Sequence, residues 1–313
     1  MSTNIPIKRN IILSSDKTLA VTLSFVYDKL TIFNLTDLMK KQIIINIEKP
    51  IDAVFSDDNE FLYVICNNST AIYKIPLYDS NKSTTSIDLS FYPQKIRSNS
   101  DNSILYCAGN TNIIQTINTD TFLVADTINL GNSKSDFNLA NFIISNDNSL
   151  LIYASKKKGL LEIINLKNNN TSTINLTTYS STIKIVDFTL SLDGSIIYVL
   201  TLDKENSIIF KISTTGNILT VVNQLSYLNT RLKGLIISLR GDPLYLINSK
   251  NKIIQIINLS TFTKGSSISL SKSPYFLLLD SIDNLGYALD KHSGYICTIN
   301  LSTNVVSSVN EVR

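Results

Sequence analysis

Few residues in this sequence are of a type and spacing that support catalysis. The chain has one histidine, His292, so a site with several histidine ligands for a metal has too few of them. A catalytic triad of Ser293, His292 and Asp290 is sterically doubtful, because the three residues lie within four positions of one loop and no group from elsewhere in the sequence orients them. No glycine-rich phosphate loop or dinucleotide fingerprint occurs. We therefore predict no catalytic residue, no metal and no cofactor.

The cysteines and one acidic run also favour structural roles. Cys66, Cys107 and Cys297 are odd in number, far apart and set in apolar segments, which predicts buried, reduced thiols. The run from Asp57 to Glu60 is rich in carboxylates but lacks the full spacing of a calcium loop. It is expected to form a tight turn.

Composition narrows the class of protein. The 313 residues are 43% hydrophobic and 17% charged, which predicts a globular chain with a substantial core. No apolar run reaches the roughly 18 residues of a membrane span, and a net charge of +3 is too small for general nucleic-acid binding. The first ten residues contain no apolar signal segment. These features predict a protein that is cytoplasmic or carried in a particle, unless a leader was removed.

A repeat of about 45 residues runs along the chain. A short strand, typically centred on Leu-Tyr-Val, recurs at spacings of 42 to 47 residues, and an apolar pair followed by Asn recurs at the same period. The positions of the first landmark are Ala20, Tyr63, Tyr106, Tyr153, Tyr198, Tyr245 and Tyr287. Two landmarks with one period indicate seven copies.

Each copy contains four short β-branched runs, which we name A to D in chain order. In the second copy they cover residues 51–55, 61–66, 71–76 and 84–89. Asp, Asn and Gly fill the A–B connections, as expected for tight hairpin turns. In the last copy residues 304–309 supply a fourth strand, although a strand from residues 2–9 is an alternative partner for ring closure.

Seven copies of four antiparallel strands predict an all-β fold, a seven-bladed β-propeller, because closure protects strand edges. The chain resembles the YVTN repeat family through Leu62-Tyr63-Val64-Ile65 and Ile197-Tyr198-Val199-Leu200, and the resemblance covers about residues 6–310. It differs from WD repeats, since no tryptophan is present. We expect one domain over residues 1–313, with blades at about 6–48, 50–90, 93–131, 138–177, 182–226, 231–271 and 273–310.

Charge is expected to differ between the two edges of the blades. The turn edge carries the A–B and C–D connections and is acidic; the loop edge carries the B–C and D–A connections and has thirteen bases against six acids. The loop edges together form a predicted basic face with recurring tyrosines, which are enriched in recognition surfaces. Candidate binding residues on it are Tyr92, Tyr179, Tyr227, Tyr275, Lys156, Lys157, Lys158, Arg231, Lys250 and Lys291. The alternative for the tyrosines is packing between adjacent blades, where each inner strand begins.

These observations predict a non-enzymatic interaction or structural module that docks a protein or glycan partner on the basic face. It is expected to be a free scaffold or a component of a larger assembly, such as a virion, a tail-like particle or a cell-surface layer. The resemblance also implies a rival, because some seven-bladed relatives are lactonases that use charged groups in the central channel. The inner A strands supply Asp52, Lys95, Arg97, Lys184 and Asp187 as candidates for that chemistry.

Overall fold

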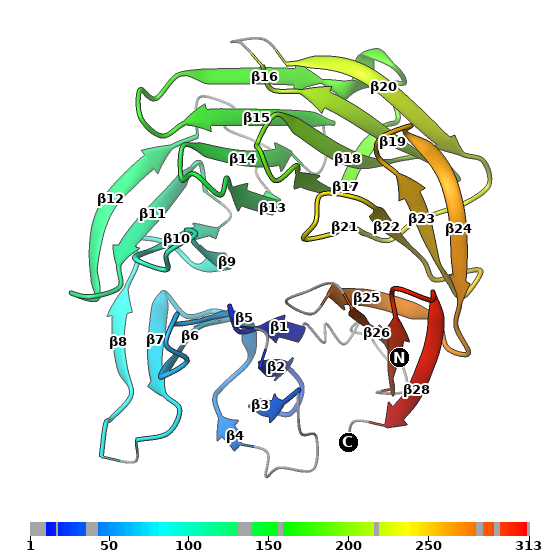
Figure 1. The fold of residues 1–313 in the computed structure, drawn as a ribbon. Coiled ribbons are helices and arrows are strands. Elements are labelled where there is room, and N and C mark those ends of the chain that lie inside the picture. Colours follow the sequence, from blue (N-terminus) through cyan, green and yellow to red (C-terminus); the bar gives the residue numbers. More distant parts are fainter. Residues whose placement is uncertain are drawn as a thin grey trace, which may run out of the picture. The chain divides into compact units, whose positions relative to one another are not determined.

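The computed structural model describes residues 11–16, 18–35, 43–79, 81–109, 111–130, 139–155, 159–215, 219–279, 284–290 and 295–311. These residues form seven four-stranded antiparallel sheets, and the strands of each sheet pair in chain order (Figure 1). The fold is a seven-bladed β-propeller, as the repeat predicts. Among the described residues the one helix is the 3-10 turn Leu176–Thr178, and no helix there is long and apolar enough to cross a membrane.

The chain divides into two compact units, Met1–Leu139 and Ala140–Arg313. The first unit holds blades 1 to 3. The strands of blade 1 are β1 (Ile11–Leu13), β2 (Leu19–Ser24), β3 (Lys29–Asn34) and β4 (Ile43–Asn46). Those of blade 2 are β5 (Pro50–Phe55), β6 (Phe61–Cys66), β7 (Ala71–Pro76) and β8 (Thr85–Asp88). Those of blade 3 are β9 (Pro93–Ser98), β10 (Ile104–Gly109), β11 (Ile113–Asn118) and β12 (Leu123–Asn129).

The second unit holds blades 4 to 7. Blade 4 consists of β13 (Leu139–Ile144), which begins at the boundary, β14 (Leu150–Ser155), β15 (Leu160–Asn165) and β16 (Thr171–Asn175). Blade 5 consists of β17 (Lys184–Leu190), β18 (Ile196–Asp203), β19 (Asn206–Ser213) and β20 (Thr220–Tyr227). Blade 6 consists of β21 (Leu235–Ile237), β22 (Leu244–Asn248), β23 (Ile253–Asn258) and β24 (Thr263–Ser269). Blade 7 consists of β25 (Pro274–Leu279), β26 (Leu285–Asp290), β27 (Tyr295–Asn300) and β28 (Val305–Glu311).

The strands of blade 2 begin and end within one residue of their predicted limits. The last blade also has its own fourth strand, because β28 pairs antiparallel with β27. The alternative strand from residues 2–9 lies outside the described residues.

The recurring Leu-Tyr-Val segment is the B strand of a blade, and both of its faces are buried. Leu62 and Val64 of β6 pack in the cluster shared with blade 1, whereas Tyr63 and Ile65 pack in the cluster shared with blade 3. Successive side chains of a strand point to opposite faces, so one short apolar strand joins two neighbouring blades. The same alternation recurs along β18 and β22. The core therefore lies between the blades of each unit.

The outermost strand of every blade is either short or interrupted. β4, β8 and β16 have four, four and five residues. The longer β12, β20, β24 and β28 each contain a register shift in their pairing with the C strand. Short strands and bulges are the usual means by which sheet edges avoid pairing with another chain.

The three cysteines are buried and form no disulfide, as predicted. Burial raises the pKa of the Cys66 thiol to about 12 and also raises the pKa values of Cys107 and Cys297. A raised pKa keeps a thiol protonated and unreactive at neutral pH. The cysteines therefore behave as small apolar core residues.

Candidate functional site

The tyrosines predicted for the basic face lie in different environments. Tyr92 and Tyr179 are exposed, at 59% and 51% of their surface. Tyr275 is half-buried at a register shift in β25. Tyr227 is buried in the cluster between blades 5 and 6, so the prediction that it is available to a partner is wrong. It ends β20 opposite Ser207, with its ring turned into that cluster, and its hydroxyl has no hydrogen-bond partner among the described residues.

The predicted basic residues are described only in part. Lys156, Lys157, Lys158 and Lys291, as well as His292, lie outside the described residues. Arg231 and Lys250 are exposed on the loop edge of the second unit. The described B–C and D–A connections of blades 4 to 7 carry one acid, Glu205, and six bases: Lys204, Arg231, Lys233, Lys250, Lys252 and Lys272.

Little of this positive charge is neutralised locally. Within the described part of the chain, Arg231 is the one base of this group that forms an ion pair, at 3.5 Å from Glu205. In the first unit, the described loop-edge connections carry Asp28, Glu48 and Lys49. The basic character predicted for the loop edge is therefore concentrated in the second unit.

The candidate channel residues hold neighbouring blades together. Asp52 is 2% exposed, and its Oδ2 lies 2.9 Å from Arg97 Nη1 and 3.7 Å from Lys95 Nζ. The same oxygen accepts a hydrogen bond from the backbone N–H of Ile96 in blade 3.

Asp187 occupies the matching place in blade 5. Its Oδ2 accepts from the backbone N–H of Leu235 in blade 6, and in both blades the aspartate sits where the pairing of strands A and B shifts register. Lys184 is exposed at the start of β17. Asp187 is half-buried, and its Oδ1 accepts the N–H of Phe188 within its own blade, whereas the bonds of the buried Asp52 described above all go to blade 3. Both aspartates thus have a bond that links neighbouring blades.

The A–B turns share one hydrogen-bonding device. In blade 4 the Ser145 hydroxyl donates to Asp147 Oδ1 at 2.6 Å and accepts the N–H of Leu150, and Ser149 donates to Asp147 Oδ2. These bonds, that from Ser145 foremost, lower the pKa of Asp147 to about 2. The residue after each turn aspartate of blades 2 to 5, Asn59, Asn102, Asn148 and Gly194, has positive φ. The turn aspartates thus have a structural use, as predicted for residues 57–60.

An acidic groove opens at the turn edge of the first unit, between blades 2 and 3. It has a volume of about 510 Å³. Its charged lining residues are Asp57, Asp58 and Lys74 of blade 2 and Asp101 and Asp120 of blade 3. None of the four aspartates forms an ion pair within the described part of the chain. The groove therefore has an excess of negative charge.

Lys74 is enclosed by aromatic rings at one wall of the groove. Its Nζ lies 4.4 Å from the ring centre of Phe61, 5.7 Å from that of Tyr63 and 5.6 Å from that of Phe122. The same Nζ donates to the carbonyl oxygen of Thr119 at 3.4 Å. An ammonium over ring faces is stabilised by the ring quadrupole. The positive charge of Lys74 is thus held against the wall rather than paired with an aspartate.

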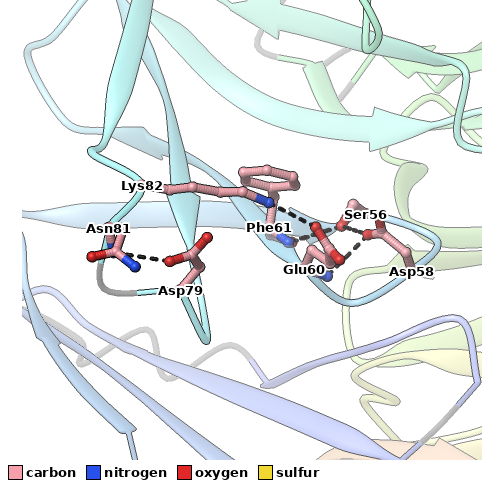
Figure 2. A network of polar contacts seen from close by, with 7 residues as sticks. All are labelled: Ser56, Asp58, Glu60, Phe61, Asp79, Asn81 and Lys82. Carbon is pink, nitrogen blue, oxygen red and sulfur yellow. Dashed lines mark hydrogen bonds and ion pairs between the residues drawn. The ribbon is translucent and has the colours of Figure 1, made fainter.

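Figure 2 shows the border of this groove at blade 2. Lys82 reaches over Phe61, 5.0 Å from the ring centre, to Glu60, with 3.0 Å between Nζ and Oε2. Ser56 donates to Asp58 Oδ1, which also accepts the N–H of Glu60. Burial raises the pKa of Asp58, but these hydrogen bonds outweigh it and leave the pKa below its usual value. Asp58 is therefore ionised at neutral pH.

Tyr63 lines the same groove and is 3% exposed. Burial, with smaller effects from the carboxylates of Asp58 and Asp120, raises its pKa to about 12. No described residue forms a hydrogen bond with its hydroxyl, which, unlike that of Tyr227, is not a fully buried unpaired atom. No pattern in the sequence predicts this groove. The sequence feature that could have pointed to it is a second acid, Asp57, in the A–B turn of blade 2. The equivalent positions of other blades hold Ser15, Ser100, Asn146, Leu192 and Leu239.

The described residues contain no group of three or more His, Cys, Asp or Glu side chains arranged to hold a metal ion. The four carboxylates of the groove come from two blades, two from each.

Comparisons with known proteins connect the chain to others by structure. No protein-family model matches it. No curated protein sequence matches it either. Among solved structures, a hydrazine synthase of Kuenenia stuttgartiensis has 16% sequence identity and a TM-score of 0.75, covering 96% of this chain and 97% of that chain. They share a fold.

Two further structures agree. A functionally unknown protein of Desulfotomaculum acetoxidans has 12% identity and a TM-score of 0.71, over 93% of this chain and 95% of that one. Hsv2 of Kluyvelomyces marxianus has 11% identity and a TM-score of 0.68, over 98% and 99%. At these identities the likeness shows the fold alone, so function has to be argued from sites.

Proposed function

We propose that the protein is a non-enzymatic docking module that binds an acidic protein partner through the loop edges of blades 4 to 6. The observation that carries this proposal is the presence of six bases and one acid in the described B–C and D–A connections that run from blade 4 to the start of blade 7. Clustered, unneutralised positive charge steers an acidic partner toward one surface and speeds its association.

Exposed apolar side chains lie on the same edge. Leu228, in the connection from blade 5 to blade 6, is 73% exposed, and Tyr179, in the connection from blade 4 to blade 5, is 51% exposed. Affinity at protein interfaces comes mainly from a few apolar or aromatic anchors, with charges around them. A surface that combines exposed apolar side chains with basic ones matches a protein partner that has acidic and apolar residues better than it matches a glycan.

The bonds of the candidate channel residues support this class over the rival lactonase-like hydrolase. A catalytic carboxylate has to reach a substrate, whereas Asp52 is almost fully buried and receives two cations and a backbone N–H. We also propose that the repeat is of the YVTN type, on the Leu-Tyr-Val cores of its B strands, and that the module works as a component of a larger assembly.

A capture experiment from native source material tests the docking surface. We expect Lys250→Glu with Lys252→Glu to lose a stoichiometric, acidic partner that the unchanged protein retains, and raised salt to release it. Lys167→Glu with Arg240→Glu is the matched control, because it reverses two charges of the same unit away from the loop edge. Leu228→Ser should also weaken capture, through loss of an apolar anchor. Equal capture by both double variants would contradict the proposed surface.

A further inference from the structure

We propose that the acidic groove between blades 2 and 3 is a second binding site, which takes a lysine or arginine side chain of a basic peptide. The groove lies on the turn edge of the first unit, apart from the connections of the second unit argued above. Its volume of about 510 Å³ is in the range of sites that enclose small organic groups. It is lined by four aspartates, two aromatic residues and further polar residues, among them Ser56, Ser103 and Thr119.

The carboxylates keep oxygen atoms available for such a ligand. Asp57 accepts bonds from Ser15 and Asn102 on Oδ1 alone, and Asp58 uses Oδ1 for Ser56 and Glu60. The Oδ2 atoms of both take no hydrogen bond from a described residue. Hydrogen bonds between cationic donors and carboxylates are the strong ones among protein hydrogen bonds. The groove therefore offers acceptors whose natural partner is an ammonium or guanidinium group.

Tyr63 adds a polar atom to the lining of the groove. The residue is 3% exposed and lines the groove, and its hydroxyl makes no bond to any described residue. The carboxylates that act on its pKa, Asp58 and Asp120, both line the groove as well. A hydroxyl oxygen can accept a hydrogen bond from a cationic donor held between those carboxylates.

The aromatic wall selects an organic cation over a metal ion. Phe61 already has the ammonium groups of two lysines of its own chain over its ring, Lys74 at 4.4 Å and Lys82 at 5.0 Å from the centre. Rings attract the methylene chain and the charge of such side chains together. A metal ion would need three or more ligands around one point, and the described carboxylates do not provide that arrangement.

The groove has a net charge of about −3, because four aspartates and one lysine, Lys74, line it. Lys74 is fixed by the Thr119 carbonyl and the rings, so it leaves the aspartates uncompensated. Lys82 and Glu60 neutralise each other at the border. A ligand with one or more positive side chains would restore neutrality.

A binding assay with labelled pentalysine, followed by fluorescence anisotropy with the full chain, tests the site. Asp57→Asn with Asp120→Asn should weaken binding about tenfold, because two exposed charge contacts are lost while the amide oxygens preserve the acceptors of the turn. Asp88→Asn with Asp126→Asn makes the same charge change outside the groove in the same unit and should leave affinity unchanged. Fully acetylated pentalysine should not bind.

A second pair of variants tests the hydroxyl itself. Tyr63→Phe removes one oxygen and keeps the packed ring, and it should weaken pentalysine binding severalfold. Tyr106→Phe, at the equivalent position of blade 3 and outside the groove lining, is its control and should bind as the unchanged protein does. Equal loss in the groove and control variants, binding of the acetylated peptide, or displacement of pentalysine by calcium with the same variant dependence would each overturn the proposal.

Discussion

Replacement of Ser145 by alanine tests the hydrogen-bonding device of the A–B turns. Ser145 is 3% exposed, and its hydroxyl both donates to Asp147 and accepts the N–H of Leu150 at 2.8 Å. Ser145→Ala removes the hydroxyl and leaves the Leu150 N–H without this acceptor in a place with little water. An unpaired buried N–H costs about 1–3 kcal/mol, whereas the Asp147 carboxylate is exposed and regains water.

We therefore expect Ser145→Ala to lower the free energy of unfolding by about 2 kcal/mol. Urea denaturation followed by far-UV circular dichroism gives that value, and hydrogen exchange at the Leu150 amide locates it. The pKa of Asp147, now about 2, should rise toward 3.8, because the Ser145 hydroxyl is the largest contribution that lowers it.

Ser149→Ala is the matched control for this prediction. Ser149 donates to Oδ2 of the same aspartate at 2.6 Å, so its loss also raises the pKa of Asp147. It leaves no backbone N–H unpaired, and we expect a cost below about 1 kcal/mol. If the two variants lost the same free energy of unfolding, the turn serine would not act through the buried amide, and the reasoning would be refuted.

Three further predictions follow from contacts described above. Asp52→Ala should lower the free energy of unfolding by about 3 kcal/mol, because it removes the carboxylate that pairs with the half-buried Arg97. Chemical denaturation measures this change, and an unchanged free energy of unfolding would contradict the role of Asp52 in joining blades 2 and 3. Tyr227→Phe should stabilise the protein by about 1 kcal/mol in a thermal melt, since it removes a buried hydroxyl without a described partner; destabilisation would reveal an unseen one. The free energy of unfolding should also fall as the pH drops from 3.8 toward 2. The pKa values of Asp147 and Asp193 are lowered in the folded state, so over this range the unfolded chain binds protons more readily. Denaturation midpoints that stay constant over this range would contradict this pH dependence.

The sequence predicted local structure well because local chemistry determines it. Asn59 and Gly194, which follow the turn aspartates of their blades, have positive φ, and the apolar run of β6 indicates a strand with two buried faces. The sequence did not decide between burial and exposure of Tyr227, since Tyr92 and Tyr227 both lie near D–A connections and only strand pairing determines which ring turns inward.

The acidic groove could not be predicted, because it forms through contacts between residues that are far apart in the sequence. Lys74 meets Phe122, from the next blade, only after two blades pack, and Phe122 itself adopts a left-handed backbone conformation that aromatic residues seldom take. Asp57 and Asp120 are likewise far apart in the chain, and the sequence alone does not show that they face one cavity.

The short or interrupted outer strands affect whether copies of this protein aggregate when they are close together. A long regular outer strand would recruit the outer strand of another copy, and each added copy would present a fresh edge, so that fibres would grow. β8 ends after four residues, and the shift in β20 breaks the ladder before it can extend. The outer strands therefore offer little regular edge for pairing between copies, so a high local concentration of this protein does not by itself start a fibre.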